Sequence, residues 1–451
     1  MIGLILSNEV EVNFMRKKSL MLLFTGMMLS SLLTGCGSQN ISSEQSTQES
    51  EVVTQEDKDK ESIDKKKDKE TADKHKDKEP VEMSSDNLIN SIKVTDLASK
   101  SSPNENMMFS PVSLNYALGM ISEGAVDETK NLLNTYLGTE SYSEFAENYL
   151  KLIDRYNSDE SSYGYNTCLE IADALWVSDE YKLKSDYEDI VRSKYDAVVK
   201  SLNFANVSDS VNEINSWVND KTHEMIKQIV SEDMFNADSV MCLTNTVYFE
   251  APWSECWNYA EGYEEDFTNF DGSTDKLCYM YGSPNAYYEN DNATAFGYDY
   301  SNGIQFIGIL PKSTGDFELS DLDIAGLLET STTKYDVEAK MPRLTFDSTI
   351  NLNDILAEMG LESIFTDDAK FTEITDELLK VSTVLQKTRI ELDENGTKAS
   401  AATAIMMDEL GAVVGDEREV KQVSLDRPFA FMIYDAFNGE TLFIGKVVNV
   451  K

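Results

Sequence analysis

The segment ENGTKASAATA, residues 394–404, most constrains what this chain can fold into. It follows a run rich in Val, Thr and Ile, residues 381–392, which is typical of a β-strand. After Gly396 every residue except Lys398 is small or carries a hydroxyl: Thr397, Ala399, Ser400, Ala401, Ala402, Thr403 and Ala404. Small side chains could enter a packed sheet without clashes, whereas an exposed loop of them buries almost nothing. The sequence therefore predicts two states for this segment, a loop and a strand.

Two other interpretations of this segment have to be weighed. Glu391, Asp393, Asn395 and Gly396 match the early positions of a calcium-binding loop, but the position that requires a bidentate Glu is Ala402. The upstream residues also favour a strand over the helix that precedes such a loop. A flexible Ala-rich linker is the remaining alternative, which composition alone leaves open.

The N-terminus has the pattern of a targeting signal. Three basic residues, 16–18, precede an apolar run over residues 20–33, and the sequence LTGC ends at Cys36. A basic N-terminal region, a short apolar run and small residues before a cleavage site are typical of a secretory signal peptide. The apolar run is short for a transmembrane span. The LTGC ending is similar to bacterial lipoprotein signals, which implies that Cys36 carries the lipid and that Met15 is the true start.

Residues 37–85 consist mostly of Ser, Gln, Glu, Lys and Asp. Such a segment cannot bury enough apolar surface to fold and is interpreted as a solvated tether. We therefore expect a signal peptide over 1–35, a lipidated Cys and tether over 36–85, and one globular domain over 86–451. This organisation predicts a protein on the extracellular face of a bacterial membrane, held by its lipid anchor alone, or a secreted one.

Composition excludes one class of partner. The net charge of −42 would repel phosphates, so no nucleic-acid partner is expected. The 41% of hydrophobic residues suffices for a large core. Residues 86–451 contain no visible repeat or long linker, so we expect one large domain that acts as a monomer.

Local patterns predict the elements of this domain. Ser110 and Pro111 indicate a helix start, in which Ser110 can cap, and the apolar residues that follow favour a buried helix with Ser113 inside. The run over 240–249 is typical of a central strand and is interrupted by Asn245, whose amide should meet polar groups such as serine hydroxyls. Further elements are a strand over 304–311, a strand over 337–346, a helix ending at Gly360 and a C-terminal hairpin around Asn438-Gly439.

The sequence gives little support for a catalytic site or a metal site. The only histidines are His75, in the tether, and His223, in a solvated helical pattern, so a positioned catalytic base is missing. Two histidines and scattered cysteines give no ligand spacing, so we expect no enzyme, no metal and no cofactor. The cysteines after the signal allow three disulfide pairings: Cys168, Cys242, Cys256 and Cys278. Cys242 lies in an apolar strand and favours a buried free thiol.

Several ordered motifs make the domain resemble a serpin over nearly its whole length. The matching stretches are NMMFSPVSLNYALGMISEGA at 106–125, ADALWV at 172–177, INSWVNDKT at 214–222, LTNTVYFEAPW at 243–253, ELDENGTKASAATA at 391–404, and RPFAFMIYD and FIGKVVN near the end. The resemblance implies an α+β serpin fold with three β-sheets, about nine helices and an exposed reactive-centre loop.

The resemblance also implies a mechanism. An inhibitory serpin offers a bait bond in its loop to a serine protease, and after acylation the upstream half of the loop inserts into the central sheet as a new strand. The protease is dragged away with a distorted active site, so the acyl-enzyme is not hydrolysed. The alternative is a non-inhibitory serpin that acts as a surface binding module; bulky, charged or proline residues between 399 and 403 would have favoured it, and none is present.

The family pattern assigns roles to residues of this chain. In the hinge, Glu394 comes first, Gly396 and Thr397 begin the inserting part, and the small residues are Ala399, Ser400, Ala401, Ala402, Thr403 and Ala404. A polar cluster that gates opening of the sheet, the shutter, comprises Ser110, Ser113, Asn245 and Gln386. Trp253 is the aromatic of the breach, where insertion starts. Three positions depart from the family: Lys398 replaces an acid, Gln386 a His and Asp173 an Asn.

The predicted position of the bait bond depends on the residue from which the loop is counted. Seventeen residues counted from Glu394 put Leu410 on the acyl side and Gly411 after it. Leu410 suits a hydrophobic primary pocket, which favours chymotrypsin-like or subtilisin-like serine proteases, with cysteine proteases as a further class. Counting back from Pro428 instead points to Glu417 or to its neighbour Arg418, and the bond between Arg418 and Glu419 would suit trypsin-like proteases.

Overall fold

The structure is a computed structural model that describes residues 86–139, 167–300, 303–398, 418–436 and 438–450, with several positions between 146 and 157. The chain divides into two units, Met1–Lys78 and Glu79–Lys451, and every described element belongs to the second. The predicted lipidation site Cys36, the hinge residues from Ala399 to Ala404 and the predicted bait bond Leu410–Gly411 lie outside the described residues.

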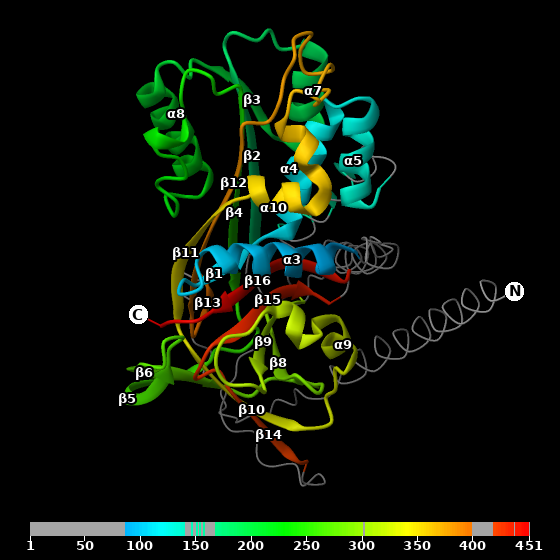
Figure 1. Ribbon diagram of the computed structural model, residues 1–451. Coiled ribbons are helices and arrows are strands. Elements are labelled where there is room, and N and C mark those ends of the chain that lie inside the picture. The colour runs from blue at the N-terminus through cyan, green and yellow to red at the C-terminus, as the bar shows by residue number, and fades with distance from the viewer. Residues whose placement is uncertain are drawn as a thin grey trace, which may run out of the picture. The chain divides into compact units, whose positions relative to one another are not determined.

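The second unit combines α-helices with three β-sheets (Figure 1), as the predicted α+β class requires. Seven α-helices occur among the described residues, where about nine were expected: α3 Asp86–Ser101, α4 Pro111–Glu123, α5 Asp127–Leu137, α7 Ser185–Tyr195, α8 Val207–Lys221, α9 Ile324–Glu329 and α10 Asn353–Leu356. In the same described part of the chain, no helix combines the length and the apolar character needed to cross a membrane.

The central sheet has the strand order β11-β12-β13-β4-β2-β3. Its strands are β2 Cys168–Ser178, β3 Val198–Leu202, β4 Met241–Pro252, β11 Leu344–Asn351, β12 Thr383–Asp393 and β13 Gly396–Thr397. Strands β12 and β4 are parallel and pair directly from Thr383 with Cys242 to Lys387 with Thr246, and they also pair with opposite sides of β13. The central strand predicted over 240–249 is thus β4.

The other two sheets complete the unit. A six-stranded sheet comprises β1 Met107–Phe109, β7 Ala286–Glu289, β8 Ala293–Asp299, β9 Ile304–Pro311, β15 Phe429–Asp435 and β16 Glu440–Val447, and a four-stranded sheet comprises β5 Asn258–Thr268, β6 Thr274–Gly282, β10 Asp336–Pro342 and β14 Val420–Ser424. The prediction of one strand over 337–346 was wrong. The chain leaves β10 at Pro342, which has no N–H for further pairing, and enters β11 of the central sheet at Leu344.

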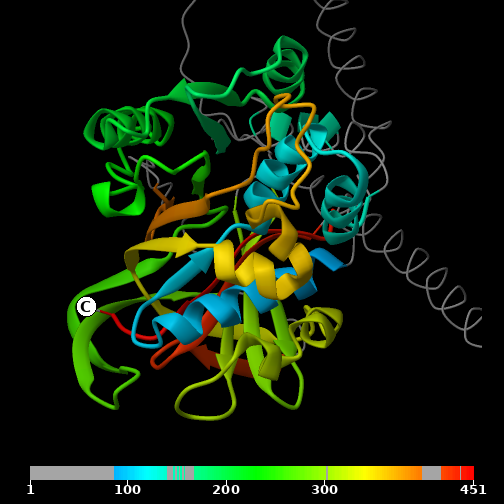
Figure 2. The same ribbon diagram turned by 45° about the horizontal axis from the view of Figure 1, so that its top comes forward.

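Helices cover both faces of the central sheet. Helix α4 is buried along Pro111–Ser122 and packs against β4 and β2, as its apolar sequence predicts. On the opposite face α8 buries Ile214 and Val218 in a separate cluster that includes Trp176. Figure 1 shows α8 and α4 on opposite sides of β4 and β2, and the rotated view of Figure 2 shows the same separation.

Candidate functional site

The first residues of the hinge lie inside the central sheet. Gly396 and Thr397 form β13, which pairs antiparallel with β12 through Asp393 and Leu392 and antiparallel with β4 through Pro252 and Ala251. A Cβ on Gly396 would lie 2.3 Å from the Ala251 carbonyl oxygen, so this close approach requires glycine. The sheet therefore already holds two residues of a strand that could lengthen.

Aromatic residues anchor β13 at the breach. The Thr397 Oγ1 lies 2.7 Å from the Tyr300 hydroxyl, and the Tyr300 ring stacks on Trp253 with centroids 4.2 Å apart. The Trp253 indole N–H donates to the Asp393 carbonyl at 2.8 Å, and its backbone N–H donates to the Asn395 carbonyl at 3.0 Å. Trp253 thus holds the turn between β12 and β13. Sequence reasoning missed Tyr300, which is 97 residues from its partner.

Glu394 is fixed by a bidentate ion pair. The Arg343 Nε and Nη2 donate to its two carboxylate oxygens at 2.8 and 2.6 Å, and the guanidinium lies 3.5 Å from the centre of the Tyr259 ring. Parallel guanidinium–carboxylate bonds fix geometry as well as charge. Sequence reasoning missed Arg343.

Lys398 ends β13. Its φ of 42° is left-handed, which takes the backbone out of extended conformation, although its N–H still donates to the Glu391 carbonyl at 2.6 Å. Its ammonium lies 4.5 Å from the centre of the Tyr248 ring, a cation–π contact on the α8 side of the sheet.

The four predicted shutter residues lie together, and all are buried. The Gln386 Oε1 accepts from the Ser110 backbone N–H, and its Nε2 donates to the Ser110 carbonyl and to the Asn245 Oδ1, each at 2.8 Å. The Asn245 Nδ2 donates to the Ser113 carbonyl at 3.0 Å. Gln386 lies on β12 and Asn245 on β4, so one amide–amide bond joins the two strands that insertion would separate.

Two expectations for the shutter serines were wrong. Asn245 does not bond to serine hydroxyls: its two N–H groups donate to the Ser113 carbonyl and to the Asp173 carboxyl. Ser110 does not cap α4 with its side chain: its hydroxyl donates to the Leu442 carbonyl at 2.8 Å. The Ser113 hydroxyl is buried with no hydrogen-bond partner among the described residues.

Asp173 extends the shutter on β2. Its Oδ1 accepts from Asn245 at 2.5 Å, and its Oδ2 is buried with no partner among the described residues. Burial raises the pKa of Asp173 to about 8, against the smaller lowering effect of the Asn245 hydrogen bond. The carboxyl is therefore mostly protonated at neutral pH, which removes the need for the donors that an ionised group would require.

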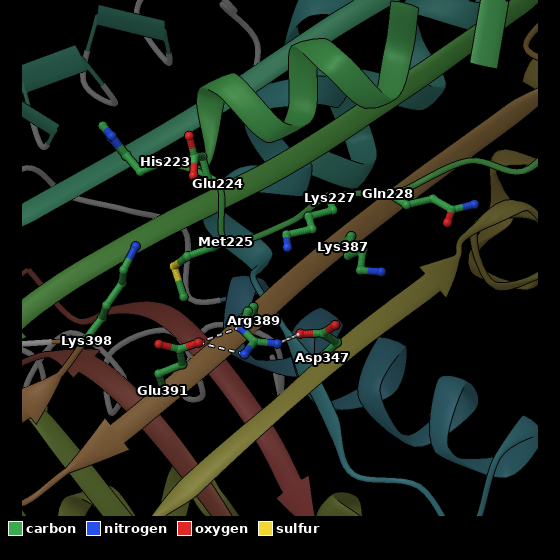
Figure 3. Close-up of a pocket in the computed structure, with 10 residues that line it drawn as sticks. All are labelled: His223, Glu224, Met225, Lys227, Gln228, Asp347, Lys387, Arg389, Glu391 and Lys398. Atoms are coloured by element: carbon green, nitrogen blue, oxygen red, sulfur yellow. Dashed lines mark hydrogen bonds and ion pairs between the residues drawn. The ribbon is translucent and has the colours of Figure 1, made fainter. Parts of the chain in front are cut away.

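Between the shutter and the hinge, β12 and β4 are not paired with each other. Direct pairing ends at Lys387 and Thr246, and β13 bridges the strands only at the far end. A cavity of about 620 Å³ lies at this level, between the turn after α8 and the sheet. Its lining includes Lys387, Arg389 and Lys398 (Figure 3), and Arg389 forms ion pairs with Asp347 and Glu391.

The remaining candidate residues include His223, which also lines this cavity. His223 is in the turn after α8, because the helix ends earlier than predicted, and its Nε2 lies 3.1 Å from Glu170. Among the described residues no group of His, Cys, Asp or Glu is arranged to hold a metal ion. Cys168, Cys242, Cys256 and Cys278 are free thiols, with Cys242 buried.

The alternative bait bond is at the edge of a strand. The Glu419 carbonyl accepts from the Asp336 N–H at 3.1 Å, and Val420 then begins β14, which pairs parallel with β10. The Arg418 guanidinium reaches the Thr333 carbonyl at 3.4 Å. The bond between Arg418 and Glu419 is therefore tied to the four-stranded sheet on its downstream side.

Comparison with known proteins agrees with this geometry. A family model described as serpin (serine protease inhibitor) matches residues 90–450. A serpin-like protein of Thermococcus kodakarensis is 32% identical over 377 residues, which cover 81% of this chain and 85% of the relative. Neuroserpin of Homo sapiens is 28% identical over 362 residues, which cover 76% of this chain and 86% of neuroserpin.

Solved structures share the fold. The thermophilic serpin tengpin in its native state aligns with a TM-score of 0.69 and 29% identity, covering 82% of this chain and 95% of tengpin. The fold thus defines an α+β protein whose central sheet holds Gly396 and Thr397 between β12 and β4. The chain belongs to the serpin family, whose members are generally protease inhibitors rather than catalysts.

Proposed function

We propose that this serpin inhibits serine proteases as a suicide substrate, by inserting its cleaved reactive-centre loop into the central sheet between β12 and β4. The observation that carries the proposal is β13, because Gly396 and Thr397 already pair with both strands. A lipid on Cys36 would place the inhibitor on the outside of a bacterial membrane.

Strand register supports insertion without sliding of the sheet. Leu392 and Ala251 face each other across Thr397, and Gln386 and Asn245 pair directly, with the same offset of 141 residues in both cases. A lengthening β13 can therefore enter between residues that are already opposite each other. Every new residue would gain backbone partners on two sides, at about 1 kcal/mol net for each hydrogen bond.

The same register explains the composition of the hinge. If this register continues along β4 toward Met241, Thr403 lies between Gln386 and Asn245. Its hydroxyl could both donate and accept there once the amide–amide hydrogen bond is broken. Ala401 would face the buried side between Thr388 and Val247. Only small or hydroxyl side chains satisfy these positions.

The length of the pairing region supports the predicted bait bond. β4 begins at Met241, which the register places opposite residue 407. Cleavage after Leu410 would thus leave three residues beyond the sheet, whereas cleavage after Arg418 would leave eleven and would require Glu419 to leave its hydrogen bond with Asp336. We therefore propose Leu410–Gly411 and a protease with a hydrophobic primary pocket.

The test is to mix the purified full-length chain with chymotrypsin, subtilisin, trypsin and a cysteine protease. We expect a complex that survives denaturation with chymotrypsin or subtilisin, and a released peptide that begins at Gly411. Chymotrypsin whose active-site serine has been blocked beforehand is the control and should give no complex.

Two results would redirect or reject the proposal. A peptide that begins at Glu419, with trypsin alone trapped, would move the bait bond to Arg418. Quantitative loop cleavage by every protease, without any trapped complex, would reject inhibition and favour the non-inhibitory binding module.

A further inference from the structure

The acidic surroundings of Lys398 suggest a specific role for this residue. Gly396 and Thr397 already have partners on both neighbouring strands. The next position in the direction of insertion is Glu250 on β4 and Glu391 on β12. Continuing the register by one residue places Lys398 between these two carboxylates. The Lys398 N–H already donates to the Glu391 carbonyl, so the β12 side of this pairing is in place.

In the present structure the Lys398 ammonium lies elsewhere. It contacts the Tyr248 ring, whose hydroxyl donates to the Glu250 carboxylate at 2.6 Å, while Glu391 is bonded to Arg389. Figure 3 shows Lys398 and Glu391 at the same cavity, with Glu391 turned toward Arg389. The backbone of Lys398 is left-handed, so extension of β13 requires this residue to change conformation and its ammonium to move.

We infer that Lys398 sets the register of loop insertion, as a positioning residue whose ammonium leaves Tyr248 and docks between Glu391 and Glu250. Opposite charges directly across strands stabilise a pair, and like charges destabilise it. Glu170 and His223 pair with each other nearby, and the other charged groups that line the cavity are Arg389, Lys387, Asp347, Glu224 and Lys227. This inference rests on the proposed function, because it concerns the first step of insertion.

A slip in register reverses the interactions. A shift by two residues keeps the same side chains on the same face, and it would place Lys398 between Arg389 and Tyr248. A lysine there meets the Arg389 cation, whereas in register it meets two carboxylates. An acid at position 398 would have the opposite preference: repelled in register and attracted to Arg389 after the slip.

The test is a charge-reversal cycle in the full-length chain. Lys398→Glu should raise the number of inhibitor molecules consumed per trapped chymotrypsin about two- to fivefold, the range expected for partly exposed cross-strand charges. Glu250→Lys should have a similar effect, and the double variant should return to within about twofold of wild type, since one charge pair is restored. Lys398→Arg should retain wild-type behaviour, and Lys93→Glu, on the exposed side of α3, controls for the change in net charge.

A second readout separates this inference from the proposed function. Each variant is cleaved once in the loop, and its melting temperature is compared with that of the uncleaved form. If cleavage fails to stabilise the wild type, loop insertion itself is rejected. If cleavage stabilises the wild type and Lys398→Glu to the same extent, or if the double variant is no better than the single ones, the role assigned to Lys398 is wrong.

Discussion

At the scale of single residues, the shutter contains a titratable group. The buried Asp173 carboxyl accepts one hydrogen bond from Asn245, and burial raises its pKa from 3.8 to about 8. Between these two pH values the folded chain holds a proton that the unfolded chain has lost. The contribution of Asp173 to stability is therefore present below pH 3.8 and falls as the pH rises to about 8.

Asp173→Asn should remove this contribution to the pH dependence. The amide is neutral at every pH, so we expect the variant to gain stability over wild type as the pH rises, by on the order of 1 kcal/mol or more near pH 7. Denaturant unfolding at several pH values measures the difference. Glu440 also has a pKa raised to about 8 by burial, so the variant keeps some pH dependence. A constant difference between the two proteins from pH 4 to 8 would contradict this account.

The sequence predicted which of these residues lie together better than it predicted their hydrogen bonds. Ser110, Ser113, Asn245 and Gln386 lie together, but both serines take part through backbone groups rather than through their hydroxyls. Their individual hydrogen bonds were not predictable, since the position of the backbone determines which carbonyl, carboxyl or hydroxyl each donor reaches. Arg343 was not predictable either, because it lies between β10 and β11 and its partner Glu394 lies in the turn after β12, 51 residues further along the chain.

At the scale of elements, the hinge can be tested by position. Ala401→Arg would bury a guanidinium between Thr388 and Val247, which should block insertion and convert the inhibitor into a substrate that is cleaved and released. Ser400→Gln is the matched control, because its side chain would face the cavity beside Arg389. The yield of denaturation-resistant complex with chymotrypsin decides the matter. Equal yields from the wild type and Ala401→Arg would argue against burial of this face.

Most strands and helices could be predicted from apolar runs and turn residues, as for β4, β9 and the hairpin of β15 and β16. The division of 337–346 into two strands was missed, since both halves are equally strand-like and only Pro342 marks the change of sheet. The position of β13 was also missed: two residues are too short for a periodic signal, and their place depends on the aromatic residues around Trp253.

At the scale of the whole molecule, the account requires two states of one chain. A complete new strand would form on the order of ten hydrogen bonds at ~1 kcal/mol net each, which is comparable to the stability of an entire domain. The form with its loop outside the sheet is then held kinetically rather than by equilibrium. This is why cleavage, which frees one end of the loop, can release the energy.

The most direct test of insertion is thermal unfolding before and after a single cut in the loop. The full-length chain is nicked with a limiting amount of protease, and mass spectrometry confirms one cleavage between residues 399 and 417. Insertion predicts that the melting temperature rises by on the order of 10 °C, given ~10 kcal/mol from the new strand. A cleaved protein that melts at the same temperature as the intact one, or below it, would contradict the account.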